Sequence, residues 1–177
     1  MTLKFPPQFD PFHMVAAPQL MGSVADEDVQ LIPLQQEMAR IGAGCSEEVA
    51  TAFLDRVEAL IASDLPPQTS GLEHTFTPGL YGRTYYMPKS SLLTSMTHAT
   101  EHQFVILSGL VMVWDRETGS KVYAAPYTGV TKPGTRRLLY TFEDTRWKTF
   151  HANPDNLTDP DEILKYFTRP HINPLLS

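Results

Sequence analysis

The chain has 177 residues, of which 42% are hydrophobic and 19% charged, and its formal net charge is −6. This length suits one domain with extensions, and the apolar content is enough for a proper core. Lys and Arg total only 14 and form no basic block, which argues against direct binding of duplex nucleic acid. The single cysteine, Cys45, excludes an internal disulfide, and there is neither a run of about 20 apolar residues nor a signal-peptide core. We therefore expect a soluble cytoplasmic protein without membrane attachment.

Residues 1–23 are predicted to be an extended, proline-rich arm. Four prolines interrupt a series of Phe and Met residues, and prolines at this density disfavour regular structure. The arm could lie across its own domain or across a neighbouring subunit. Because exposed sheet edges and an apolar arm both need cover, we expect a homo-oligomer with the arm at the interface.

Residues 24–70 are predicted to be a helical extension. A first helix is indicated by acidic residues from Asp26, is limited by Pro33, and ends at two glycines, Gly42 and Gly44.

A second helix is indicated after Ser46, a residue type suited to an N-cap. Apolar residues recur after it at spacings of three and four, and they predict one apolar face formed by Val49, Phe53, Val57, Leu60 and Ile61. The charged positions of this helix, Asp55 and Glu58 among them, are interpreted as a solvated face.

From residue 71 to residue 153 the hydrophobic period falls to two, which indicates a domain of many short strands. Nine strands are expected, at residues 74–77, 82–87, 91–97, 103–107, 111–115, 121–125, 129–131, 137–142 and 147–151. Strands of this number and length fit a jelly roll, although the periodicity alone also allows another sandwich or barrel. Residues 154–177 are predicted to form a turn, a short capped helix and a tail.

Two histidines and a glutamate precede one of these strands. If the strand is regular, His98 and His102 share a face that continues into Phe104, whereas Glu101 has the opposite parity. Neutral imidazoles can bind a metal and protonated imidazoles can bind an anion, but two nitrogens alone do not make a strong site.

This stretch resembles the first motif of the cupin superfamily, in which glycine is followed by His-x-His, three or four residues, Glu, six residues and Gly. Counting back from Gly109 places His102 at the glutamate position, His98 at the second histidine and Met96 at the first. Two of these three ligand positions therefore hold side chains that can bind a metal.

The second cupin motif, Pro-x-Gly-x-x-His, is approached by the Lys-Pro-Gly-Thr-Arg-Arg sequence of residues 132–137. Arg137 stands at the position of the third histidine, and a guanidinium cannot ligate a metal because it is always protonated. The resemblance covers residues 79–153. It implies a mainly β fold, with one cupin-like jelly-roll barrel, an N-terminal helical extension and a short C-terminal helix.

The spacing also resembles small cupin-like proteins encoded by tailed bacteriophages. That resemblance implies a non-catalytic structural or assembly component, or an accessory binding protein, with other phage proteins as partners. It places the protein in the host cytoplasm or in the virion.

Three interpretations of the predicted cavity stay open. His98 and His102 could bind a divalent transition metal together with water or Glu101, or Arg137 could hold a small anion with help from the histidines. The cavity could also be a polar interior without a ligand. His151 could close the cavity, although we favour a structural role for it at the end of its strand.

Two further functions remain as alternatives. A metal-dependent cupin enzyme, of the dioxygenase, isomerase or decarboxylase type, would need a third strong ligand. A small-molecule or sugar-binding module would use flat surfaces at the barrel mouth, supplied by Tyr81, Tyr85, Tyr86, Trp114 and Tyr127. Nucleotide-binding and nucleophile-elbow motifs are absent from the sequence. We therefore favour a protein without catalysis and assign no catalytic residue.

Overall fold

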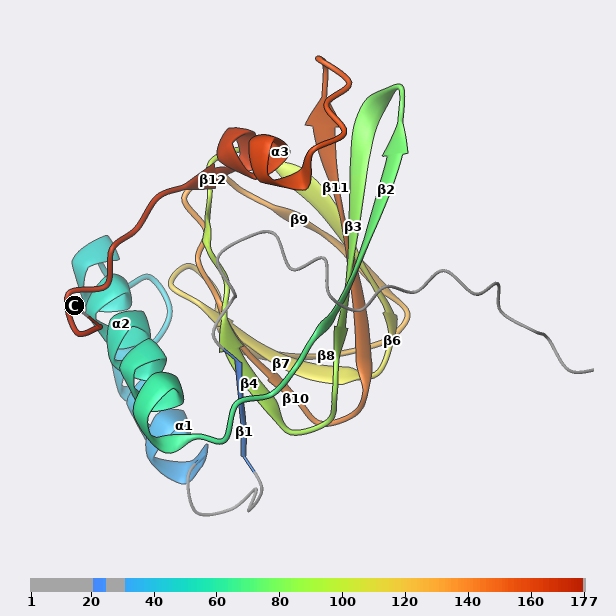
Figure 1. The fold of residues 1–177 in the computed structure, drawn as a ribbon. Coiled ribbons are helices and arrows are strands. Elements are labelled where there is room, and N and C mark those ends of the chain that lie inside the picture. Colours follow the sequence, from blue (N-terminus) through green and yellow to red (C-terminus); the bar gives the residue numbers. More distant parts are fainter. Residues whose placement is uncertain (1–20, 25–30, 177) are drawn as a thin grey trace, which may run out of the picture.

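The computed structural model describes residues 21–24 and 31–176. Within these residues the chain forms two five-stranded sheets, a two-stranded ribbon and three helices (Figure 1). The strands are β1 (Met21–Ser23), β2 (Gly71–Thr77), β3 (Gly79–Met87), β4 (Ser91–Thr94), β5 (Thr97–His98), β6 (His102–Ser108), β7 (Leu110–Asp115), β8 (Gly119–Ala124), β9 (Tyr127–Thr131), β10 (Leu138–Thr141), β11 (Thr145–Asn153) and β12 (Thr168–Arg169). The helices are α1 (Leu31–Ile41), α2 (Glu47–Asp64) and α3 (Pro160–Phe167).

The strands alternate between two antiparallel sheets. The first sheet has the order β1-β4-β10-β7-β8, and the second has the order β2-β3-β11-β6-β9. The chain crosses from one sheet to the other between β3 and β4, β6 and β7, β8 and β9, β9 and β10, and β10 and β11. This winding is a jelly roll, so the predicted mainly β, cupin-like barrel with helices at either end of the sequence is confirmed.

One predicted strand is divided. The segment predicted as residues 91–97 becomes β4, which pairs with β10 in the first sheet, and β5, which pairs with β12. The two pieces separate because they satisfy their backbone groups with different partners: the backbone N–H of Ser95 donates to the carbonyl of Arg137, and His98 is the partner of Thr168.

The strands β4, β10 and β7 of the first sheet are buried on both faces, whereas the edge strand β8 is largely exposed. Along β7, Val111 and Val113 point into the barrel, whereas Met112 and Trp114 point outward and lie under α1 and α2. The Trp114 ring meets Phe53 of α2 edge-on, with 4.9 Å between ring centroids. The helical extension therefore shares a core with the barrel, which gives the apolar face of α2 the large surface that it needs.

The second helix begins at the predicted N-cap, but some of the residues that it buries are not those predicted. The Ser46 hydroxyl oxygen accepts from the backbone N–H of Val49 at 3.3 Å, which is the expected N-cap. Val49, predicted in the apolar face, is 47% exposed, because it lies in the first turn beyond the edge of the sheet-facing stripe. Asp55, predicted in a solvated face, is only 5% exposed, because it is bound to Arg136.

Two predictions for the N-terminal part are wrong. Pro33 does not limit the first helix but lies within the first turn of α1, where a missing backbone N–H is tolerated. Residues 21–23, predicted as part of an irregular arm, form β1 and pair with β4, because the edge of the first sheet offers them backbone partners. The rest of the arm, with the interface role predicted for it, lies outside the described residues.

The C-terminal segment covers one end of the barrel. The Asp159 carboxylate accepts from the backbone N–H of Asp161 at 2.9 Å and caps α3. Ile163 and Phe167 of this helix pack on Tyr81 of β3. After β12 the chain runs back to α2 (Figure 1), where the Asn173 side chain donates to the carbonyl of Asp55 at 2.9 Å. None of the helices described spans a membrane by length and apolarity.

Candidate functional site

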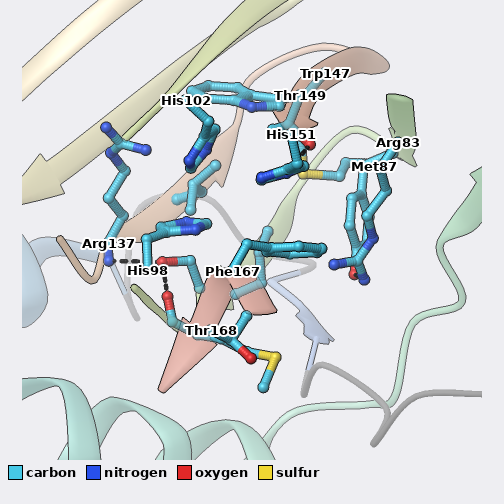
Figure 2. Close-up of a pocket in the computed structure, with 15 residues that line it drawn as sticks. Arg83, Met87, His98, His102, Arg137, Trp147, Thr149, His151, Phe167 and Thr168 are labelled. Carbon is cyan, nitrogen blue, oxygen red and sulfur yellow. Dashed lines mark hydrogen bonds between the residues drawn. The ribbon is translucent and has the colours of Figure 1, made fainter. Parts of the chain in front are cut away.

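A cavity of about 70 Å³ lies inside the barrel, at the end that α3 and β12 cover. Its polar walls are Arg83, Ser95, His98, His102, Arg137, Thr149 and His151, and its apolar walls include Met87, Leu93, Leu139, Trp147 and Phe167. At roughly 10–15 Å³ for each water, this volume suits a few waters or one small molecule. Figure 2 shows His98, His102 and His151 gathered in the middle of the cavity wall, with Arg137 on one side and Arg83 on the other.

His98 and His102 meet in this cavity although they do not share a strand. His98 ends β5 and His102 begins β6, and the chain turns between them, yet their ring centroids lie 4.5 Å apart. The backbone N–H of His98 donates to the carbonyl of Thr135 at 3.0 Å, and the N–H of Gly134 donates back to His98 at 2.8 Å. The turn of the second motif therefore fixes the first histidine of the pair.

His151 joins the two other histidines from β11. Its ring lies 4.3 Å from that of His102 and stacks on Phe167 at 3.8 Å, measured between ring centroids. Its Nε2 lies 2.9 Å from the Thr149 hydroxyl, which shares its face of the strand. His151 thus makes structural contacts and also lines the cavity.

Arg137 points into the cavity and is only 8% exposed. One guanidinium nitrogen donates to the Thr131 hydroxyl at 2.8 Å, and the group lies 5.2 Å from the centroid of the Phe104 ring. Its backbone N–H donates to the Ser95 hydroxyl at 2.9 Å, which holds the residue in this direction (Figure 2).

Glu101 does not belong to this constellation. It is exposed at the turn between β5 and β6 and does not line the cavity, because its parity is opposite to that of His102. Met96, at the position of the first cupin histidine, does line the cavity and contributes an apolar surface.

Arg83 is a cavity residue that the sequence analysis missed. It stands on β3 and donates a hydrogen bond to the Tyr85 hydroxyl, and its guanidinium carbon lies 4.5 Å from the centroid of that ring. Its parity in β3 is that of Tyr81, Tyr85 and Met87, which are apolar or aromatic. The sequence signal for Arg83 is a charged residue at a position that alternates with apolar residues on the inward face of a strand.

Among the described residues, the cavity carries positive charge without a carboxylate in its wall, and the carboxylate that acts on Arg137 through space is that of Asp115, outside the cavity wall. Burial, together with a smaller contribution from neighbouring cationic groups, lowers the pKa of His98 to about 2, of His102 to about 4 and of His151 to about 3. All three rings are therefore neutral at pH 7, while Arg83 and Arg137 keep their charge. Among the residues described here, neither arginine forms an ion pair with a carboxylate.

Several buried polar atoms in the cavity wall have no protein partner. They are Nδ1 of His98, Nε2 of His102, Nδ1 of His151 and Nε of Arg83. The Nδ1 of His102 lies 3.3 Å from the carbonyl oxygen of Thr100, which only accepts, so the proton of the neutral ring is assigned to Nδ1 and Nε2 is an acceptor. Buried polar atoms are normally paired, so these atoms indicate a hydrated or ligand-filled cavity.

The donor set does not fit the divalent metal that the cupin resemblance implies. Within the described part of the chain, no three His, Cys, Asp or Glu side chains are placed to hold a metal ion. Arg137 stands where a third nitrogen ligand is expected, and no carboxylate lines the cavity to offset the charge of a cation. Two guanidiniums in a poorly solvated space would repel a divalent cation.

No protein-family model matches the sequence, and no curated protein sequence matches it either. Among solved structures, the cupin domain of Schizosaccharomyces pombe Cnp3 is 16% identical over 51% of this chain and 65% of that chain, with a TM-score of 0.42. An RmlC-like cupin family protein from Methanocaldococcus jannaschii is 11% identical over 51% and 87% of the two chains, with a TM-score of 0.41. An acetylacetone dioxygenase from Acinetobacter johnsonii is 11% identical over 50% and 66%, with a TM-score of 0.39. A likeness at this level concerns the arrangement of strands and transfers no activity, ligand or partner.

Proposed function

We propose that this protein is a binding module that holds a small anion, a carboxylate or a phosphate, inside its barrel. The observation that carries the proposal is Arg137, which is 8% exposed, lines the cavity and has no carboxylate partner among the described residues. An uncompensated charge away from water is costly, and an anion in the cavity would compensate it through charge-assisted hydrogen bonds.

The other cavity residues suit this role. The three neutral imidazoles and the Thr149 hydroxyl offer hydrogen-bonding groups without adding negative charge that would repel the ligand. The His102 Nε2 acceptor would be satisfied by a water retained beside the anion or by a hydroxyl of the ligand. Binding without catalysis agrees with the accessory binding role that the sequence resemblance implies. A role in phage assembly stays a prediction.

Isothermal titration calorimetry on the full chain at pH 7 tests the proposal, with acetate and inorganic phosphate as ligands and a chloride buffer as reference. We expect saturable binding of at least one of the two anions, and a loss of affinity of at least tenfold in Arg137→Leu. Arg146→Leu is the matched control, because Arg146 is an exposed arginine of β11 that contacts Tyr86 outside the cavity. Equal affinities in the two variants would overturn the proposal.

Elemental analysis of the purified protein separates this function from that of a metal-dependent enzyme. A transition metal at one equivalent per chain, lost in a His98→Asn and His102→Asn double variant, would move the assignment to a metal site. We expect no stoichiometric metal.

A further inference from the structure

Two arginines face the cavity from its opposite sides. Arg83 lies on β3 of the second sheet, whereas the guanidinium of Arg137 is bonded to Thr131 at the end of β9. The sheet order β3-β11-β6-β9 separates these strands by three inter-strand steps, or roughly 14 Å between backbones. Figure 2 shows the two arginine side chains on either side of the three histidines.

A carboxylate forms its paired, bidentate hydrogen bonds with one guanidinium at a time. Arg137 has one hydroxyl as its side-chain partner, and Arg83 has a hydroxyl and a buried Nε without a partner. A carboxylate at Arg137 would leave Arg83 without a counter-charge. The charge pattern of the cavity is therefore complementary to two negative groups that are held apart.

Apolar side chains complete the cavity wall beside the histidines. Met87, Leu93 and Leu139 line it, and Trp147 stacks on Phe104 behind it with 4.4 Å between ring centroids. Such a wall suits a short hydrocarbon segment, and the volume of about 70 Å³ excludes a long one.

We infer that the ligand is a short linear molecule with an acidic group at each end, such as a dicarboxylate, and that Arg83 binds the second acidic group. This inference rests on the proposed anion site and assigns Arg137 to the first group. Arg83 is then the residue that selects diacids over monoacids.

Calorimetry on the full chain with malonate, succinate, glutarate and adipate tests the inference, with butyrate as the monoacid. We expect one chain length to bind best, at least tenfold more tightly than butyrate, because a second guanidinium–carboxylate contact is added. In Arg83→Gln the preferred diacid should fall to within about threefold of butyrate, while butyrate itself changes by less than about threefold. Arg146→Gln is the control with the same change of charge and should leave all affinities unaltered.

Diacids that bind no better than butyrate at any chain length would overturn the inference and leave the anion site standing. Equal weakening of butyrate and diacids in Arg83→Gln would also overturn it, because Arg83 would then act only through its charge. If no anion binds to the wild-type chain, the anion site fails and the inference fails with it. If Arg83→Gln does not fold, the same titrations on Arg83→Lys and the chain-length series on the wild type test the preference for diacids.

Discussion

Arg136 and Arg137 are neighbours in sequence and both direct a guanidinium away from solvent, but the two regions that they enter differ in charge. Arg136 points away from the barrel toward α2, where its nitrogens lie 2.8 Å from an Asp55 oxygen and 2.5 Å from a Glu58 oxygen. The Arg136 side chain is only 8% exposed. Arg137 points into the barrel and meets one threonine hydroxyl and no carboxylate among the described residues. Arg136 thus has two carboxylate partners within the fold, whereas Arg137 has none among the described residues.

The outer region is a closed network that joins three segments. The Nε2 of His171 lies 2.7 Å from the Asp55 oxygen, and the Asn173 side chain donates to Glu58 at 3.0 Å. This network therefore stabilises Arg136, the two carboxylates and the C-terminal tail together. Polar contacts hold the tail on α2, because its apolar residue Ile172 is 84% exposed. The cavity, in contrast, contains unpaired polar atoms and two arginines that form no ion pair with the residues described.

The largest expected effect comes from breaking the outer network. Arg136→Leu strands two carboxylates, one of them almost fully buried, and should lower the free energy of unfolding by about 3–5 kcal/mol. For a chain of this length, that loss corresponds to a fall in Tm of roughly 10 °C. Urea and thermal unfolding measure it, and adding Asp55→Asn and Glu58→Gln should recover part of the loss. A change below about 1 kcal/mol would contradict the role assigned to this network.

Acidification should destabilise the folded protein through the three histidines of the cavity. The folded-state pKa values of His98, His102 and His151 lie below the ordinary value of 6.5, so the unfolded chain binds more protons as the pH falls. Stability due to these neutral rings is complete above pH 6.5 and is lost from there down to the folded values, about 4 for His102 and lower for the others.

Between pH 7 and 5.5 the loss should be about 1 kcal/mol for each histidine that stays neutral. Urea midpoints across this range measure it. His151→Asn should show a shallower dependence than the wild type, and a slope that is the same in both proteins would refute the assignment.

A smaller effect is expected from removing the inner arginine. Arg137→Leu removes a buried charge that has no ion-pair partner among the described residues, so the free energy of unfolding should change by less than about 1 kcal/mol or should increase. The contrast with Arg136→Leu in the same urea experiment is the sharpest test of the difference between the two regions. A loss of about 3–5 kcal/mol in both variants would show that Arg137 has a structural counter-ion after all.

No effect is expected from a chelator. The barrel and helix core carry the fold, so thermal unfolding with and without EDTA should coincide. A fall in Tm of more than about 10 °C would amount to a few kcal/mol and would reveal a structural metal.

Most elements of this fold are predictable from local sequence patterns. Eight of the nine predicted strands, the cap at Ser46 and the helix before Phe167 agree with the structure, because a period of two or of three to four and the residues that end each element are local properties. The ninth predicted strand, residues 91–97, is divided between two sheets. The spacing of the cupin-like motifs also led to His98, His102 and Arg137, since the motif carries information about pairing that periodicity lacks.

Which of these residues come into contact depends on how the sheets and helices pack. Asp55 reads as a surface residue of a helix, and its partner Arg136 lies 81 positions away, so its burial could not be inferred from α2 alone. Arg83 and His151 become cavity residues because β3 and β11 pair side by side in the sheet that closes over Arg137. Local pattern gives the face of a strand on which a side chain lies, but the charge opposite that face depends on how the two sheets close.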